Sequence, residues 1–435
     1  MTTLSVGVYG IYALTNAWFV ARGVGPTAMG AVNLVAPLLL ILGAVATTVG
    51  IGGASLVSRS LGAGDPARAA RAAGNAFIMF WAVAVVTTVG GLLALEPLLT
   101  VLGATPELRG MARDYAVIIL AGAIFATGFS SLVRAEGRMR FSTLLWVVPV
   151  LVQITLDPLL IFGFGMGVRG AALGTVGGQA VSAGMALWFF FGQRQRPYRI
   201  TLADLKPHWP TIVELVGVGA PSFLAGFGAT LLAVLVNTRL SWDSGAVALA
   251  AFAICARIQT FVLMPQLGIS QGLQPVVGFN AGRGLRTRVL RARRLSLSAT
   301  VGYGVAVAML VALLAGPLVA VFVGDDETVA ATARHALRII AIGFAVAGIA
   351  PLVSAYCQSL GRPAPSYLIS VGTLLLLKIP LLLAFSTLGL TGVWIGLSAG
   401  ELAAAIAALI VLRVARPDVD VSGKPFGFAR RRPAL

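Results

Sequence analysis

The chain has 435 residues, of which 58% are apolar and only 11% charged, whereas an ordinary soluble domain has about 25% charged residues. This composition excludes a soluble enzyme. The 32 Lys and Arg residues outnumber the 15 Asp and Glu residues and leave a formal net charge of +17. The basic residues fall mostly in short breaks between long apolar segments, which accounts for them in a membrane protein, so no nucleic-acid partner is expected.

Apolar segments follow one another along the chain, most of them at least as long as the roughly 20 residues that span a bilayer. The first is short, and no basic region precedes it, so a cleavable signal peptide is not expected. The sequence therefore predicts an all-α polytopic membrane protein whose partner is the lipid bilayer. We count twelve segments, at 4–20, 28–56, 72–94, 115–133, 142–163, 170–191, 211–236, 246–274, 295–322, 338–359, 366–386 and 390–412.

The Lys and Arg residues are unevenly distributed over the breaks. When the breaks are assigned alternately to the two sides of the membrane, one side receives 23 of these residues and the other seven, while two lie within segments. Because basic loops stay on the cytoplasmic side, both termini are expected in the cytoplasm and the protein in the plasma membrane, the inner membrane of a bacterial or archaeal cell. Attraction of these breaks to an anionic inner leaflet accounts for the positive charge.

The second half of the sequence repeats the first. Residues 157–179 align with 379–401 at a constant offset of 222, and other pairs agree with small slips. Parallel repeats of six helices are a recurrent transporter architecture, with the substrate site between the halves near the midplane. The aligned pairs include Pro158 with Pro380, Gly170 with Gly392, Gly174 with Gly396, Gly178 with Gly400, Ala63-Gly64 with Ala281-Gly282, and Gly137-Arg138 with Gly361-Arg362.

The repeat predicts two pseudo-symmetric six-helix bundles that form a V-shaped cleft. The N-terminal lobe comprises residues 1–193 and the C-terminal lobe residues 211–413. Residues 194–210 form a cytoplasmic linker, and 414–435 form a basic cytoplasmic tail. Glycines at every fourth position in each lobe are expected to let helices approach closely in lipid.

Two motifs that resemble functional sites have structural explanations. The GxGxxG of Gly165, Gly167 and Gly170 lies in a break between apolar segments, without the strand that a dinucleotide site requires. Cys255 and Cys357 lie within apolar segments of different halves, where free cysteine usually packs as a small hydrophobe. No metal-ligand spacing and no converging nucleophile and base are present, so neither a cofactor nor an enzyme is expected.

Polar residues within the apolar segments are candidates for function, because an ionisable group there costs several kcal/mol on insertion scales. Asp157 lies in the fifth segment, with Gln153 four residues earlier on the same helix face and Thr175 at similar depth in the sixth. Asn16 and Tyr12 add polar atoms if the first helix packs beside the fifth. Such a set suits a proton on the carboxylate or Na⁺ bound by Asp157 and Thr175; alternatively, Asp157 stabilises a helix interrupted at Pro158.

The second half carries a more scattered polar set. Glu401 in the twelfth segment either forms a buried ion pair with Arg257 or Lys378, or faces the cleft and holds a cationic substrate. The sequence leaves both interpretations open. The candidate substrate-cleft residues of this half are Glu401, Arg257, Gln266, Gln271 and Asn237.

Four motifs resemble those of the multidrug and toxic compound extrusion (MATE) transporters of prokaryotic type, and the resemblance runs over nearly the whole chain. They are GIGGASLVSRSLGAGD at 50–65, LVRAEGRMR at 132–140, LDPLLIFGFGMGVRGAALGT at 156–175 and GISQGLQPVVGFNAGRG at 268–284. The resemblance implies twelve helices in two lobes around a V-shaped cleft. It also implies export of amphipathic organic cations, drugs or metabolites, in exchange for inward H⁺ or Na⁺. The chain is expected to function as a monomer.

The resemblance further implies a coupling-ion site in the N-terminal lobe. Asp157 and Thr175 match the family pattern, whereas Gln153 replaces the family Asn and Asn16 stands where the first helix usually has an acid. Ser130, or its neighbour Ser131, would supply the polar residue of the fourth helix. One carboxylate instead of two favours coupling to H⁺. The alternative function is a flippase of the same superfamily for a lipid-linked precursor or another cargo.

Overall fold

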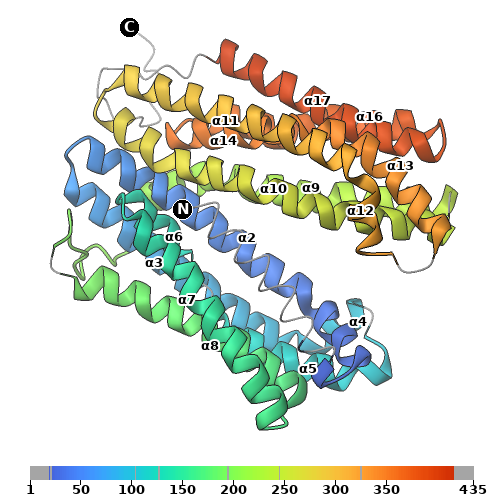
Figure 1. Cartoon of the computed structure of the whole chain (residues 1–435). Helices are drawn as coiled ribbons and strands as arrows, with labels where there is room; N and C mark the ends of the chain where they lie inside the picture. The colour runs from blue at the N-terminus through green and yellow to red at the C-terminus, as the bar shows by residue number, and fades with distance from the viewer. Residues whose placement is uncertain are drawn as a thin grey trace, which may run out of the picture.

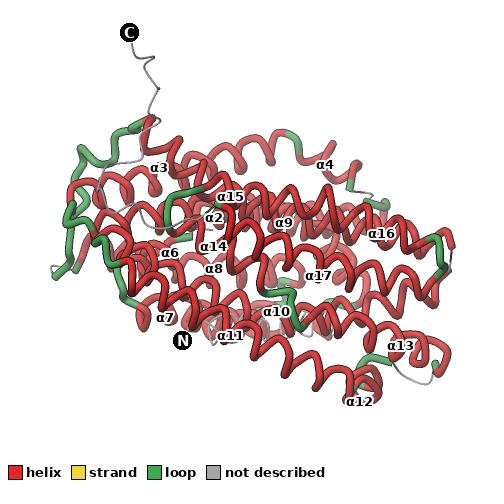
Figure 2. The backbone as a smooth tube through the Cα atoms, turned by 90° about the horizontal axis from the view of Figure 1, so that it is seen from above, coloured by secondary structure: helices red, strands yellow, loops and turns green. Residues whose placement is uncertain are grey.

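The computed structural model describes residues 19, 22–102, 104–125, 128–193, 195–243, 245–323 and 326–415. The expected first segment, with Tyr12 and Asn16, lies almost wholly outside these residues, as does most of the expected basic tail. The described secondary structure is helical throughout, with the helices running side by side (Figure 2). The all-α prediction is therefore confirmed.

The helices form two lobes that meet along α2, α9 and α10 (Figure 1). The N-terminal lobe contains α2 (Pro26–Gly62), α3 (Pro66–Leu93), α4 (Leu95–Val101), α5 (Pro106–Ala121), a 3₁₀ turn (Gly122–Phe125), α6 (Phe129–Ala135), α7 (Met139–Pro158) and α8 (Gly167–Leu187), with π-helical segments at Leu159–Gly163 and Trp188–Gly192.

The C-terminal lobe repeats this order after its first helix, α9. It contains α9 (Trp209–Asp243), α10 (Gly245–Gly282), α11 (Arg286–Leu313), α12 (Ala315–Ala320), α13 (Glu327–Phe344), α14 (Ile349–Ser359), α15 (Pro363–Tyr367), α16 (Ile379–Ser386) and α17 (Leu390–Val414), with π-helical segments at Leu368–Gly372 and Leu374–Lys378.

Nine helical segments within the described residues are long and apolar enough to span a membrane. Two further expected spans, 28–56 and 170–191, are helical as α2 and α8. Five arginines that were expected in a break, from Arg286 to Arg294, instead lie in the first turns of α11. Arginine is a good helix former, so α11 can continue beyond the apolar layer.

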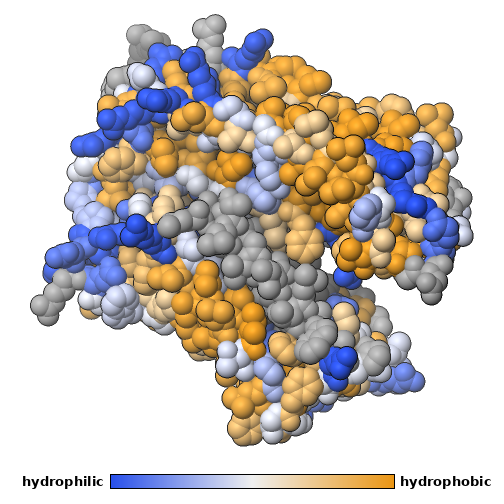
Figure 3. All heavy atoms as spheres, viewed as in Figure 1, coloured by the Kyte–Doolittle hydropathy of each residue, from blue (hydrophilic) through white to orange (hydrophobic). Residues whose placement is uncertain are grey.

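One end of the molecule carries most of the basic residues, and we call it the basic end. It contains the α2–α3 turn, the α6–α7 turn, residues 195–208 and the α10–α11 turn. Figure 3 shows hydrophilic residues at both ends of the visible face, an apolar band between them, and a recess between the lobes opposite the basic end. The V-shaped arrangement therefore closes at the basic end.

Small residues bring α2 and α10 together at the basic end. A Cβ atom added at Gly62 would lie less than 3.0 Å from the carbonyl oxygen of Phe279, and one at Gly282 equally close to that of Arg59. Both residues of one contact are related to those of the other by the same offset of 220. The contact is thus reciprocal, as expected for two lobes related by a pseudo-two-fold axis.

The same offset corrects one detail of the sequence alignment. Gly64 and Gly284 both have positive φ, 74° and 71°, in the turns that follow α2 and α10. The structural equivalent of Gly64 is therefore Gly284, two residues later than the Gly282 of the alignment. Sequence similarity alone paired Gly64 with Gly282 because Ala-Gly occurs in both turns. It is followed by Asp in the first turn and by Arg-Gly in the second.

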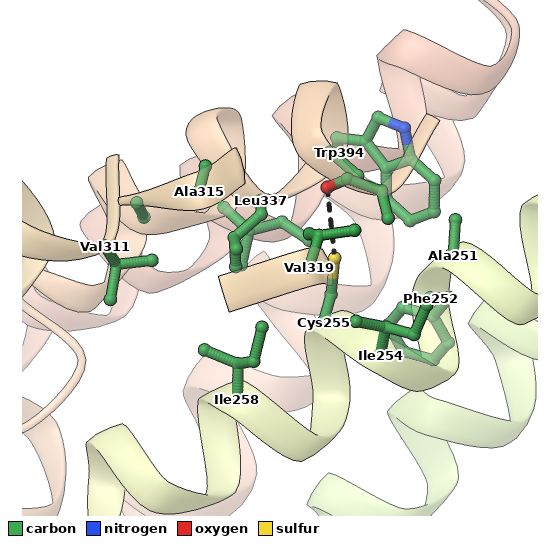
Figure 4. Packing of buried hydrophobic residues seen from close by; sticks show 14 of the residues in the cluster. Ala251, Phe252, Ile254, Cys255, Ile258, Val311, Ala315, Val319, Leu337 and Trp394 are labelled. Carbon is green, nitrogen blue, oxygen red and sulfur yellow. Dashed lines mark hydrogen bonds between the residues drawn. The ribbon is translucent and has the colours of Figure 1, made fainter. Parts of the chain in front are cut away.

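Each lobe has two clusters of buried apolar side chains, one nearer each end. In the cluster of the C-terminal lobe away from the basic end, Phe252 stacks on fully buried Trp394, and the thiol of Cys255 points toward the carbonyl of Ala333 (Figure 4). Cys255 and Cys357 are both free and buried. Neither position offers a reactive, accessible thiol.

Candidate functional site

Asp157 lies near the end of α7, where its residue is only 1% exposed. One turn earlier, Gln153 donates a hydrogen bond from Nε2 to Oγ1 of Thr175 on α8, at 2.8 Å, and both residues are 5% exposed. Thr175 Oγ1 in turn donates to the carbonyl of Ala171 at 3.1 Å. The structure thus brings together three of the predicted site residues, all buried, on two adjacent helices.

Gly174 makes room for the Asp157 carboxylate. A Cβ at residue 174 would lie 3.2 Å from Cγ of Asp157 and still closer to its Oδ1. One turn to either side, Gly170 and Gly178 approach the backbone of residues 160 and 149. The glycines therefore do more than pack α8 against α7, because the central one also sets the position of the acid.

A cavity of about 370 Å³ lies beside Gln153 and Thr175, inside the N-terminal lobe. Its walls come from α2, α6, α7 and α8, and Gln271 of α10 completes it from the other lobe. Its polar lining includes hydroxyl, amide and guanidinium groups but no acidic residue among those described. The residues that line it are Gly43, Ala46, Thr47, Ile51, Phe125, Gly128, Ser130, Ser131, Arg134, Leu145, Trp146, Pro149, Val150, Gln153, Thr175, Gly178, Gln179, Ser182 and Gln271.

The structure separates Ser130 from Asp157, contrary to the expectation that they share an ion site. Ser130 Oγ accepts a hydrogen bond from Nε1 of Trp146 at 3.1 Å. Trp146 is eleven residues before Asp157 on α7, or about 16 Å along the axis at 1.5 Å per residue. The separation arises because α5 ends at Ala121 and α6 begins only at Phe129, nearer the basic end. Ser130 lines the part of the cavity nearer the basic end.

Glu401 forms an ion pair with Lys378, one of the two interpretations that the sequence left open. Lys378 Nζ donates to its Oε1 at 2.6 Å, and the two side chains are 22% and 19% exposed. Neither residue lines the cavity. Of the two partners considered from the sequence, Lys378 is therefore the one in contact, because its π-helical segment packs directly against α17.

The other candidates of the C-terminal lobe do not gather into one site. Arg257 and Asn237 are exposed and line no described part of the cavity. Gln266 is 3% exposed and points into its own lobe, where Nε2 lies 3.5 Å from the carbonyl of Phe344. Only Gln271 faces the cavity. The sequence spacing shows which residues of α10 share a helix face. It does not show which part of the molecule that face contacts.

Sequence reasoning missed the role of Arg134. The fourth expected segment ends at residue 133, which predicts Arg134 in a basic break, but it lies in α6, is 6% exposed and lines the cavity. Its Nη2 donates to Oγ of Ser131 at 2.8 Å and its Nη1 to Oγ of Ser142 at 3.4 Å. A sequence signal was present, since Arg134 stands apart from Arg138 and Arg140, directly after an apolar segment.

Ion pairs join the lobes at the basic end. Glu214 of α9 accepts hydrogen bonds from Arg59 of α2 at 3.1 Å and from Arg68 of α3 at 3.0 Å. Close by, Oγ of Ser55 on α2 donates to the carbonyl of Gln358 on α14 at 2.6 Å. These contacts hold the basic end closed.

The linker after α8 is fixed by a second buried pair. Arg196 donates to the carboxylate of Glu136, with the two side chains 1% and 0% exposed. The Arg196 guanidinium also lies over the rings of Phe190 and Tyr198, at 4.5 and 4.7 Å from their centroids. Burial first, and the charge of Glu136 second, raise the pKa of the Tyr198 hydroxyl well above its ordinary value.

Within the described ranges, no three His, Cys, Asp or Glu side chains come together in a group able to hold a metal ion. Oxygen ligands for a monovalent cation are present at Asp157 and Thr175. The arrangement therefore provides a buried carboxylate that can bind a proton or a cation, next to a cavity of a size that suits a small organic molecule.

Comparisons with known proteins agree with this architecture. The MatE family model matches the chain twice, over residues 3–159 and 221–383. The chain is 27% identical over 417 residues to the multidrug export protein MepA of Staphylococcus haemolyticus, covering 94% of this chain and 91% of that protein. It is 26% identical over 428 residues to MepA of Staphylococcus aureus strain N315, covering 97% and 92%.

Solved structures of related transporters have the same fold. An outward-facing multidrug resistance MATE transporter of the MOP superfamily superposes with a TM-score of 0.89 at 26% identity, covering 96% of this chain and 94% of that one. A MOP superfamily transporter from Pyrococcus furiosus, described as having a binding pocket of reverse polarity that suggests a different function, gives 0.88 at 25% identity, covering 98% and 95%. The chain therefore belongs to the MatE family of multi-pass membrane transporters, which export compounds and are not enzymes.

Proposed function

We propose that the protein is a secondary antiporter that exports amphipathic organic cations in exchange for H⁺, with Asp157 as the proton-binding residue. The observation that carries the proposal is a carboxylate 1% exposed, one helical turn from Gln153, which lines the cavity. A buried carboxylate is stable only when it is neutralised by a proton or a cation. Loading and release of that proton would then favour different conformations of the N-terminal lobe.

Transport would proceed by alternating access of the two lobes. Residues 1–193 and 211–413 would rock about α2, α9 and α10, with 194–210 as the linker and 414–435 as the tail. The present conformation is closed by the Arg59 and Arg68 pairs with Glu214. Opening the other way would require these pairs to break at the basic end, which we assign to the cytoplasm together with both termini. One chain contains both lobes and is proposed to work as a monomer.

The cavity suits a small amphipathic cation. Phe125 and Trp146 offer aromatic faces, which attract cations, and Gln179 offers an amide. A flippase for a lipid-linked precursor would need room for a sugar and several cationic groups for a diphosphate. The volume of about 370 Å³ and the presence of one arginine among the described lining residues favour the exporter.

The test uses the full chain in liposomes loaded with a fluorescent organic cation, with pH and Na⁺ gradients imposed separately. A pH gradient alone should drive efflux, and Asp157→Asn should abolish it. Asp114→Asn is the matched control, because Asp114 is an exposed acid paired with Arg169 on the surface. Undiminished gradient-driven efflux by Asp157→Asn would remove Asp157 from the coupling step.

A second variant tests whether the coupling ion is H⁺ or Na⁺. Asn16→Asp restores the acid that relatives of this type have on the first helix, so it should add dependence on Na⁺ to a carrier driven by protons. An unchanged ion profile in Asn16→Asp would show that the first helix does not contribute to the ion site. If a Na⁺ gradient alone drives efflux by the wild type, the coupling ion is Na⁺ bound at Asp157 and Thr175 and not a proton.

A further inference from the structure

Arg134 forms part of the cavity wall nearest the basic end. It is 6% exposed, and the serines that it contacts lie on either side of the α6–α7 turn. Ser142 is fifteen residues before Asp157 on α7, which corresponds to about 22 Å along the helix axis. Asp157 is therefore too distant to neutralise the guanidinium.

The partners of Arg134 are neutral. A guanidinium has five N–H donors, and the contacts of Arg134 are to two serine hydroxyls. No carboxylate of the described residues lies within 4.0 Å of it. Two other largely buried arginines differ in this respect, because Arg196 pairs with Glu136 and Arg59 with Glu214. A buried cation without a counter-charge is costly unless something else supplies the negative charge.

The repeat shows that the arginine is particular to one lobe. With the offset of 224 that relates Gly137 to Gly361, the equivalent of Arg134 is Gln358 in α14. Gln358 is 1% exposed and exchanges hydrogen bonds with Ser222 of α9. A glutamine thus fits this place in the fold, so packing alone does not require a charged residue at 134.

We propose that Arg134 is the recognition site for an anionic group, a carboxylate or its equivalent, on the transported compound. The planar fork of a guanidinium matches the two oxygens of a carboxylate. Combined with the aromatic walls of Phe125 and Trp146, this site would select zwitterions, with the cationic ring system against the aromatic faces and the anion at Arg134. The inference rests on the proposed function and narrows its substrate class from organic cations to compounds that also carry a negative group.

Rhodamine 123 and rhodamine 110 form a matched pair of probes, because the first is the methyl ester of the second and has no free carboxylate. Binding of each to the full chain in dodecyl maltoside is measured by fluorescence polarisation. The wild type should bind rhodamine 110 at least tenfold more tightly, the lower range for a charge-assisted hydrogen bond. Arg134→Gln should bring the ratio of the two dissociation constants to within about twofold of one, with little change for rhodamine 123.

Arg140→Gln is the control, since it removes the same charge from an exposed position six residues away and should keep the wild-type ratio. Equal binding of the two probes by the wild type, or an unchanged ratio in Arg134→Gln, would overturn the proposal. If Arg134→Gln does not fold, Arg134→Lys decides the question. Lysine keeps the charge but not the fork, so the preference should fall severalfold, and a wild-type ratio would exclude recognition by the guanidinium.

Efflux of the same probes separates this inference from the antiport proposal. Asp157→Asn should lose gradient-driven efflux of both dyes while it retains the preference for rhodamine 110 in binding. Wild-type protein that shows the binding preference but no gradient-driven efflux would refute the antiporter and leave the Arg134 site in place. Gradient-driven efflux without any binding preference would refute the Arg134 site alone.

Discussion

Replacement of Gly174 by alanine tests the position of Asp157 most directly. The added Cβ would lie closer to Oδ1 of Asp157 than the 3.0 Å below which real Cβ atoms essentially never approach. The carboxylate must therefore rotate, or α8 must move away from α7. Overpacking of this kind costs about 1–3 kcal/mol. The variant should also lose proton-driven efflux, because the acid no longer sits next to Gln153 and Thr175.

Gly184→Ala is the matched control, because it lies on the same helix and its Cβ would meet nothing within 4 Å. Both changes gain the helix propensity of alanine, about 0.5–1 kcal/mol, so the difference between them isolates the steric cost. The free energy of unfolding is measured by titration with SDS in mixed micelles, with Trp fluorescence as the signal. Gly184→Ala should be slightly more stable than the wild type, and Gly174→Ala should be less stable.

A double-mutant cycle with Asp157→Ala completes the test. Alanine at 157 removes the carboxylate, so Gly174→Ala should then be tolerated, with a coupling energy of about 1–3 kcal/mol between the two sites. If Gly174→Ala is as stable as Gly184→Ala in the wild-type background, the close approach between Gly174 and the carboxylate is wrong.

Three further predictions concern the ion pairs. Glu136→Gln leaves Arg196 buried without a counter-charge and should lower the free energy of unfolding by about 3–5 kcal/mol in the SDS assay, whereas a loss below about 1 kcal/mol would contradict the burial of the pair. Glu214→Gln should open the basic end, seen as longer distances between spin labels on α3 and α10, and unchanged distances would show that Glu214 does not hold the lobes closed. Glu401→Gln should lower the free energy of unfolding by about 1–3 kcal/mol without changing which compounds are exported. The double variant Lys378→Met and Glu401→Met should recover the lost stability. A changed set of exported compounds in Glu401→Gln would show that Glu401 faces the cleft.

Much of the fold was predictable because the apolar periodicity and the repeat are properties of the sequence itself. Spans of about 20 apolar residues must cross the bilayer as helices, since only helices and closed barrels satisfy their own backbone groups there. The pairing of Gln153 with Asp157 was also accessible, because residues four apart share a helix face. Thr175 was placed near them through the resemblance and through its depth in the next segment.

The parts that the sequence did not predict depend on contacts between distant segments. Ser130 lies nearer the basic end than expected because the chain is irregular between α5 and α6, and no pattern marks how far that break shifts the register. Arg134 directly follows an apolar segment and is expected in a break, whereas it lies in α6 and faces a cavity built by helices of both lobes. Glu401 had two possible partners, and only the packing of α17 against the segment that ends at Lys378 decided between them.

The reciprocal contact of Gly62 and Gly282 has a consequence for the history of the molecule. In a six-helix ancestor that assembled with a second copy of itself, one codon would have specified both glycines, and a single change to a larger residue would have damaged the interface twice. In the present chain two codons specify the two positions, so each half can carry residues that the other lacks. The arginine at 134 and the glutamine at 358 are such a difference between equivalent positions.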